Sequence, residues 1–355
     1  DDARHRQRMA FLLPGPCVDS SYVSLPGLSN NRCRLLSRSS KRLTRKVFVV
    51  SCSFSASSGA SHSTLGLSKS NSSNLSIKDG KPRITPRTRP TNVTHPSLFE
   101  APASFAETVH EKFPGVVTQE DFVQSTYEAL TELGFTKYNT IPCVSLCRDE
   151  ICRPLFGLLQ ETWCVPDSSA GIFNMSSLGG MLYLGKTGLA AANSHAPQMD
   201  GYERYVYIAM PHIAIDEDGH VGYCRREGRS EVSKACGALI GFQHELSAGK
   251  LNVELDEEDI EQSLLKQQLL KRIKYGTVPD LVDLTKVTMA AILDSLEIAI
   301  RATVNPSNSH YAVLTGIQIH GPDEKHYVYP SVMYAVVGKQ RFQIDIPRSG
   351  ITHTL

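Results

Sequence analysis

Residues 140–154 read TIPCVSLCRDEICRP and combine three cysteines, two arginines and an Asp-Glu pair. The apolar and β-branched run 139–146 predicts a short buried strand. Residues 149–163 predict a helix whose regular part begins at Pro154, because proline is tolerated in the first turn of a helix but not in its interior. Cys147 is therefore expected at the corner between strand and helix. Three roles are open for these thiols: core packing, a redox pair, or metal ligation.

Strands and helices alternate along the rest of the folded part. A helix is expected from Thr118 onward, because Thr118 can cap its first turn, and Gly134 can end it. Further predicted helices cover residues 231–248, 256–274 and 279–303, and further predicted strands cover 204–210, 311–319, 327–337 and 341–346. This alternation predicts a layered α/β or α+β fold without an internal repeat.

The composition excludes several classes of protein. The chain has 355 residues, 41 % of them apolar, and a formal net charge of +1, which is enough for one large domain or two small ones. A charge near zero argues against a nucleic-acid or membrane-surface role for the whole chain. No run approaches the roughly 18 apolar residues of a membrane-spanning helix. Nine cysteines are too few for a disulfide framework in a chain of this length, and an odd count leaves at least one thiol free. Both observations indicate a reducing compartment.

The N-terminal part differs from the rest in charge. Residues 9–78 carry nine Lys or Arg and a single acid, Asp19, and are rich in serine. This composition is typical of a transit peptide for a plastid or mitochondrion, although a basic disordered tail has the same composition. We predict a transit-peptide-like N-terminus at 1–76, a linker at 77–99 and one domain at 100–355. The linker is rich in Pro, Thr and Ser, so no fold is expected before the domain.

The spacing of the three thiols does not match a redox motif. Cys143, Cys147 and Cys152 are four and five residues apart, so they contain no C-x-x-C pair. In an extended strand Cys143 and Cys147 share a face but lie too far apart for a disulfide. Cys143 and Cys152 are interpreted as core packing. Cys147 differs, because a helix N-terminus stabilises a thiolate through its free N–H groups and its dipole.

Two further residues could complete a metal site with Cys147. His212 follows the predicted strand 204–210, and Cys236 begins a helical run, so both lie at the ends of elements. Two cysteines and one histidine leave the fourth position of a tetrahedral zinc ion open, which is the pattern of a catalytic site. Spacing alone does not establish the site, because a domain of this length offers some Cys/His trio by chance.

Four motifs carry a resemblance to a known family: VSLCRDE, SLGGMLYLGKTGLAAANSHAP, GYERYVYIAMPHIAID and SKACGAL. They are similar to motifs of the low-CO2-inducible B protein (LCIB) family, also called θ-type, which is related to β-carbonic anhydrases. The resemblance covers residues 100–346 in order. It implies a β-carbonic-anhydrase-like layered α/β fold with a central, mostly parallel sheet flanked by helices. It also implies that Cys147, His212 and Cys236 hold Zn²⁺ and that Asp149 is the catalytic carboxylate.

The chemistry implied by this resemblance is the reversible hydration of CO2 to bicarbonate. Zinc lowers the pKa of water to about 7, and the resulting hydroxide attacks CO2. Asp149 accepts a hydrogen bond from the hydroxide, and an arginine must hold Asp149 away from the metal; otherwise Asp149 takes the place of water. β-Carbonic anhydrases supply this arginine in a C-x-D-x-R pattern, but Ile151 occupies that position here. Arg153, four residues after Asp149, is predicted as the partner, with Arg148 as the alternative.

We therefore predict a zinc-dependent carbonic anhydrase of the plastid stroma that concentrates or recaptures CO2. The resemblance implies a homodimer or a larger homo- or hetero-oligomer with a related subunit. Two alternatives remain open: a catalytically silent zinc-binding scaffold or partner subunit, and a redox protein that uses the three thiols. Among the remaining polar residues, His195 could shuttle protons or be structural, and Arg225 and Arg226 could bind bicarbonate or be exposed.

Overall fold

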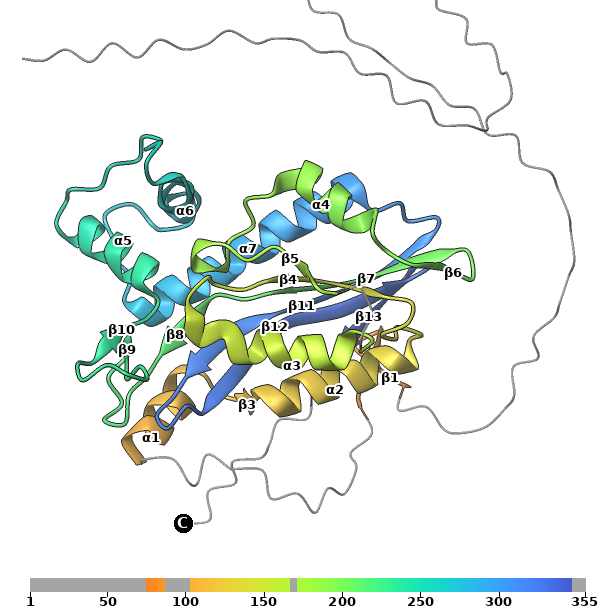
Figure 1. Ribbon diagram of the computed structural model, residues 1–355, viewed down its shortest axis with the longest axis horizontal. Coiled ribbons are helices and arrows are strands. Elements are labelled where there is room, and N and C mark those ends of the chain that lie inside the picture. The colour runs from red at the N-terminus through yellow and green to blue at the C-terminus, as the bar shows by residue number, and fades with distance from the viewer. Residues whose placement is uncertain (1–74, 87–102, 167–170, 347–355) are drawn as a thin grey trace, which may run out of the picture. The chain divides into compact units, whose positions relative to one another are not determined.

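The computed structural model describes residues 75–86, 103–166 and 171–346 (Figure 1). Apart from residues 75–76, the predicted transit-peptide-like segment lies outside the described residues. The helices are α1 (Ala103–Lys112), α2 (Gln119–Glu132), α3 (Arg153–Trp163), α4 (Gly185–Asn193), α5 (Gly237–Ser247), α6 (Ile260–Leu270) and α7 (Leu281–Thr303), with short 3-10 helices η2 (Glu150–Cys152) and η3 (Leu178–Gly180). The strands are β1 (Leu75–Lys78), β2 (Lys81–Ile84), β3 (Val117–Thr118), β4 (Ile141–Ser145), β5 (Phe173–Asn174), β6 (Gln198–Met199), β7 (Tyr202–Ala209), β8 (His212–Ala214), β9 (Tyr223–Cys224), β10 (Ser233–Lys234), β11 (Ser309–His320), β12 (His326–Val337) and β13 (Gln340–Ile344).

Most of the described strands form one mixed sheet, whose main path runs β1-β2-β13-β12-β11-β7-β4-β5. One half is parallel: β5, β4, β7 and β11 run in the same direction, and β8 continues alongside β11 beyond the end of β7. Antiparallel ladders join β12 to β11, β13 and β3. The predicted layered α/β fold is confirmed. The sheet is mixed rather than mostly parallel, because β11 and β12 form a long hairpin.

Helices cover both faces of this sheet. Figure 1 shows α4 and α7 on one face and α2 and α3 on the other. In agreement with that view, α2 contacts α3 and β12, and α7 contacts α4 and β11. A strand covered on both faces is apolar throughout, and all five residues of β4 are buried. No helix in the described part of the chain is both long enough and apolar enough to cross a membrane.

A hairpin upstream of the predicted domain start belongs to the sheet. β1 and β2 pair antiparallel, and β2 pairs in parallel with β13, where Ile84 is 2 % exposed beside Ile344. Asp79 and Gly80 form the turn with φ of 53° and 71°, the left-handed values that tight Asp-Gly hairpin turns adopt. The expectation of no fold before residue 100 is therefore wrong for 75–86, because the Asp-Gly turn and the pairing with β13 override the polar composition.

The strand-to-helix corner that opens the sequence forms as predicted. β4 ends at Ser145, the 3-10 turn η2 follows, and the regular helix α3 has Pro154 in its first turn. Proline lacks an N–H but needs none at that position, so the helix can start there. Cys147 lies between the strand and the turn.

The helix predicted at 231–248 begins later than expected, at Gly237. Ser233–Lys234 pair with β9 instead, and Cys236 occupies the N-cap position of α5. Cys147 and Cys236 thus each lie just before a helical turn, at the same edge of the parallel half of the sheet.

Gly180 lets η3 pass close to the segment that leads into β8. Its φ is 73°, and a Cβ built there would lie 2.3 Å from the carbonyl oxygen of Met210. Replacing Gly180 with Ala is expected to lower the free energy of unfolding by roughly 2–5 kcal/mol, since a left-handed alanine costs about 1–2 kcal/mol and the clash adds about 1–3 kcal/mol. The control is Gly185→Ala, where φ is 59° but no atom lies within 4 Å, so only the smaller loss is expected. Urea unfolding measures both variants, and equal losses would contradict the prediction.

Candidate metal centre

Three buried side chains meet where the parallel strands end. Cys147 follows β4, His212 is the first residue of β8, and Cys236 is the N-cap of α5. Their sulfur and nitrogen atoms all lie within 4.8 Å of one another, and the two sulfurs are 4.0 Å apart. Each residue is at most 6 % exposed. The fold therefore brings together the three residues that the motifs had grouped.

The donor set fits a zinc ion. Neither ring nitrogen of His212 has a hydrogen-bond partner among the described residues, although the ring is fully buried. A buried polar atom without a partner costs about 1–3 kcal/mol, and a metal ion on one of these nitrogens with an acceptor close to the other would remove that cost. Two thiols and an imidazole are ligands that zinc prefers, and they leave a fourth position open.

The three groups also shift one another's protonation. The hydrogen bond with Cys236 lowers the pKa of Cys147 to about 4, against the opposing effect of burial. The same contact raises the pKa of Cys236 well above its usual range. Burial by itself would lower the pKa of His212, but the charges of neighbouring thiols raise it. A dication binds deprotonated thiols and a neutral imidazole, so metal binding would release the protons that these groups still carry.

Asp149 lies beside the donor set and is held by Arg226. Its two carboxylate oxygens accept hydrogen bonds from Arg226 at 2.7 and 2.9 Å, and one also accepts from the N–H of Ile151 at 3.3 Å. Oδ2 lies 3.9 Å from Nε2 of His212. Burial would raise the pKa of Asp149, but the hydrogen bonds from Arg226 and the charges of His212 and Arg226 hold it below its usual range. The carboxylate is thus ionised and fixed in direction.

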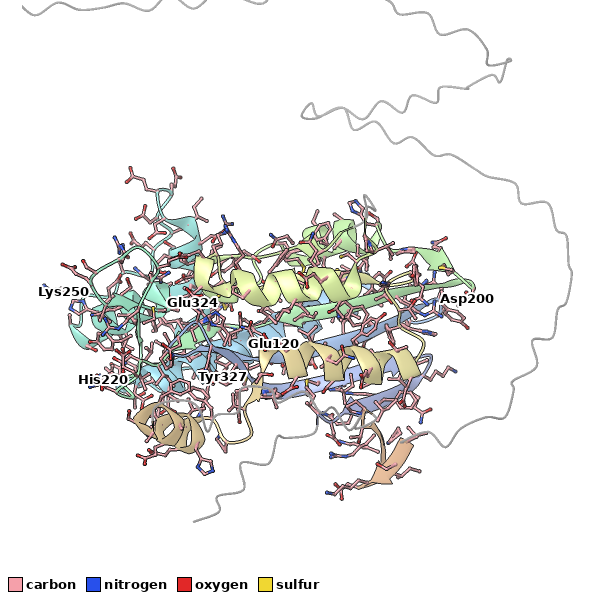
Figure 2. All side chains as sticks on the ribbon, turned by 60° about the horizontal axis from the view of Figure 1, so that its bottom comes forward. Glu120, Asp200, His220, Lys250, Glu324 and Tyr327 are labelled. Carbon is pink, nitrogen blue, oxygen red and sulfur yellow. The ribbon has the colours of Figure 1, made fainter. Side chains whose placement is uncertain are left out.

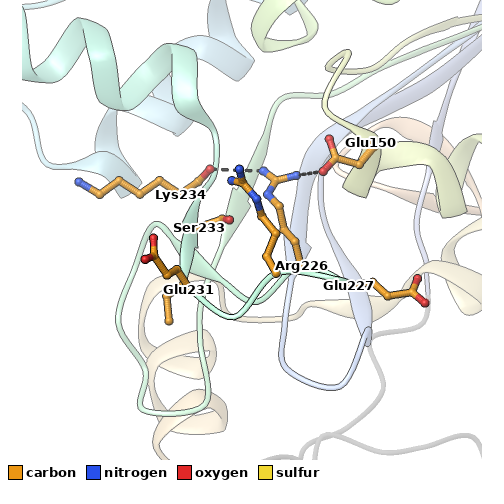
Figure 3. Close-up of a pocket in the computed structure, with 8 residues that line it drawn as sticks. Glu150, Arg226, Glu227, Glu231, Ser233 and Lys234 are labelled. Carbon is orange, nitrogen blue, oxygen red and sulfur yellow. Dashed lines mark hydrogen bonds and ion pairs between the residues drawn. The ribbon is translucent and has the colours of Figure 1, made fainter.

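Arg226 reaches Asp149 from a loop that is distant in sequence. The loop joins β9 to β10 and lies 77 positions after Asp149. The guanidinium also contacts Glu150 and the carbonyl oxygen of Lys234, which hold it in place (Figure 3). The side chains of Arg226 and Asp149 are 15 % and 12 % exposed. A bidentate pair that is this well buried sets the orientation of the carboxylate.

The predicted pairing of Asp149 with Arg153 is wrong. Arg153 is exposed at the start of α3, and both oxygens of Asp149 are occupied by Arg226. The spacing argument assumed a continuous helix from Asp149, but Asp149 is the N-cap of η2, outside the helical turns. Arg148, the alternative, pairs with Glu261 at 2.5 Å instead.

A cavity opens beside this site. Its volume is about 550 Å³, and its lining includes Cys147, Asp149 and Cys152 together with the apolar side chains of Leu146 and Phe156. A small molecule in this cavity would therefore meet both the carboxylate and one sulfur of the donor set.

The remaining candidates lie elsewhere. His195 lines a separate cavity at the amino end of β4. Arg225 is exposed and pairs with Glu217. Cys143 is fully buried within β4, where burial raises its pKa. Figure 2 shows His220 at the periphery, where its side chain is exposed.

Sequence reasoning also missed residues that surround the donor set. The buried hydroxyl of Tyr183 has no hydrogen-bond partner among the described residues. Burial raises the pKa of this hydroxyl most, and the negative charges of Glu261, Cys147 and Cys236 raise it further. His320 contacts Cys152 and forms a second buried group with Cys152 and His212. These residues come from separate elements, so no local spacing could have pointed to them.

Comparisons with known proteins agree on one family. A family profile described as limiting CO2-inducible proteins B/C beta carbonic anhydrases matches residues 116–337. The crystal structure of limiting CO2-inducible protein LCIB is similar at 33 % identity and a TM-score of 0.55, covering 66 % of this chain and 96 % of that one. The structure of PtLCIB4, a homolog of LCIB, is similar at 24 % identity over the same shares, also with a TM-score of 0.55, which supports the fold alone. No curated protein sequence matches the chain.

Proposed function

Because the chain belongs to the family of limiting CO2-inducible proteins B/C beta carbonic anhydrases, which confirms the resemblance in its four motifs, we propose that it is a zinc-dependent carbonic anhydrase. Its reaction is the reversible hydration of CO2 to bicarbonate. The observation that carries the proposal is the buried group of Cys147, His212 and Cys236 beside a carboxylate, Asp149, that Arg226 keeps ionised.

Each residue has a distinct part in this reaction. Cys147, His212 and Cys236 would hold Zn²⁺, which would supply hydroxide near neutral pH by lowering the pKa of water to about 7. Asp149 would accept a hydrogen bond from the attacking oxygen and so orient it toward the carbon of CO2. Arg226 donates to both oxygens of Asp149, which keeps the carboxylate ionised and would keep it from replacing water as a ligand. The lining of the adjacent cavity is mostly polar, but Leu146 and Phe156 give it an apolar part that suits CO2, which carries no charge.

Stopped-flow CO2 hydration by the full chain, with zinc content determined on the same sample, tests this function. One zinc ion per chain and hydration that is lost with a chelator and restored by zinc are the expected results. Zinc without hydration would contradict the enzyme and leave a zinc-binding scaffold or partner subunit. A purified protein that contains and takes up no zinc would contradict the metal site itself.

The cellular setting belongs to the same proposal. We place the protein in the plastid stroma, where it concentrates or recaptures CO2 as a homodimer or a larger assembly with a related subunit. The support is the family description and the basic, serine-rich composition of residues 9–78. Microscopy of a C-terminal fluorescent fusion and light scattering of the purified chain test location and assembly.

A further inference from the structure

A second buried polar group lies behind His212, and the proposed reaction does not use it. Cys152 ends η2, His320 ends β11 and His326 begins β12. Cys152 Sγ and His320 Nε2 are 3.7 Å apart, and His320 Nδ1 and His326 Nδ1 are 3.1 Å apart. Cys152 and His320 are each 2 % exposed. Polar groups are costly to bury unless they satisfy one another, so these contacts form a connected network.

The sheet aligns this group with His212. In the parallel ladder of β8 and β11, His212 pairs with Gln318 and Ala214 pairs with His320. Paired positions share a face of the sheet, so His212 points to the same side as Gln318. Every second residue along a strand also shares a face, so His320 points to that side as well. Their ring centroids are 5.2 Å apart. A nitrogen of His212, a nitrogen of His320 and the sulfur of Cys152 all lie within 4.8 Å of one another.

A metal-ligating imidazole uses one nitrogen for the ion and keeps a hydrogen on the other, and that hydrogen needs an acceptor. The carboxylate of Asp149 is a poor choice, because it lies 3.9 Å from Nε2 of His212 and Arg226 occupies both of its oxygens. Cys147 and Cys236 are themselves proposed ligands of the ion, so they are not available as acceptors. Among the described residues grouped with His212, Cys152 and His320 remain. Both ring nitrogens of His320 already have partners, Cys152 and His326, so the sulfur of Cys152 is left to accept this hydrogen.

We propose that Cys152 is a positioning residue of the metal centre, whose sulfur accepts the hydrogen of the His212 nitrogen that faces away from the ion. Its S–H donates to Nε2 of His320, and Nδ1–H of His320 donates to Nδ1 of His326. The network rests on the proposed zinc site and holds the His212 ring in the orientation for ligation. It ends at a cavity of about 1030 Å³ that His320 and His326 line.

Zinc affinity of the full chain, measured by competition with a chromogenic chelator, tests this role. Cys152→Ala is expected to weaken zinc binding by about 10–100-fold, the usual effect of removing a group that orients a ligand. Cys152→Ser is expected to regain most of this loss, because a hydroxyl can also accept and donate. Cys143→Ala removes an equally buried thiol outside the network and is expected to leave zinc affinity unchanged. Equal affinity of Cys152→Ala and Cys143→Ala, or a Cys152→Ser variant no better than Cys152→Ala, would overturn the proposal.

Cobalt substitution adds a readout that does not depend on CO2 hydration. The intensity of the sulfur-to-cobalt absorption band reports the number of thiolate ligands, and the wild type and Cys152→Ser are both expected to show one ion with two thiolates. Three thiolates in the wild type, or a second ion, would make Cys152 a ligand and overturn its positioning role; this measurement needs no variant to fold. A wild type that binds no metal would contradict the proposed function instead, whereas metal binding that Cys152→Ala leaves intact would overturn the positioning role alone.

Discussion

Replacing Cys147 with Ala is expected to remove zinc from the protein and reduce CO2 hydration to the uncatalysed rate. Structural zinc sites bind with about 10–16 kcal/mol, so each of three or four ligands contributes roughly 3 kcal/mol or more. The loss of one ligand then weakens binding at least about 100-fold. Hydration falls with it, because the metal supplies the hydroxide. Zinc content after dialysis and stopped-flow hydration on the same sample measure both effects.

Cys143→Ala is the matched control for this prediction. Cys143 lies four positions earlier, within β4, and its thiol is also buried, but it belongs to none of the groups of neighbouring metal-ligand side chains found among the described residues. We expect this variant to keep its zinc and its activity. A Cys147→Ala protein with a full complement of zinc would show that Cys147 is not a ligand.

Replacing Arg226 with Ala is expected to lower CO2 hydration by about 10–100-fold while zinc stays bound. The variant leaves the Asp149 carboxylate, which is 12 % exposed, without its cation, so the free energy of unfolding should fall by roughly 3 kcal/mol. Burial alone raises the pKa of Asp149, and the hydrogen bonds from Arg226 lower it, so their loss raises this pKa. Because hydration needs the ionised carboxylate, the acidic limb of the pH–rate profile should move to higher pH.

Arg153→Ala is the control for this prediction, because it also removes one positive charge but leaves the pair of Asp149 and Arg226 intact. Arg153 was the partner expected from sequence, but its side chain is exposed, so hydration, zinc content and the pH–rate profile should stay unchanged. Stopped-flow measurements across pH on both variants decide between the two arginines. A larger loss for Arg153→Ala than for Arg226→Ala would mean that the active protein pairs Asp149 differently from the geometry described here.

Much of the local structure could be predicted because its causes are local. The buried strand before Cys147, the proline that permits α3 to start and the capped start of α2 each depend on residues within one or two turns. The Asp79-Gly80 turn was equally local, but the polar composition around it led to the expectation of a linker. The pairing of β2 with β13 joins ends of the chain far apart in sequence, so composition could not show it.

The sequence by itself determined which residue types could form the metal centre and placed Cys147, His212 and Cys236 at the ends of elements. Only the tertiary structure decided what surrounds them: that Asp149 pairs with Arg226 and not with Arg153, and that Cys152 lies against His320. The physical reason is the range of the interactions involved. Backbone propensities and turn chemistry act over a few residues, whereas an ion pair across 77 positions exists only once sheet packing has brought the β9–β10 loop to the end of β4.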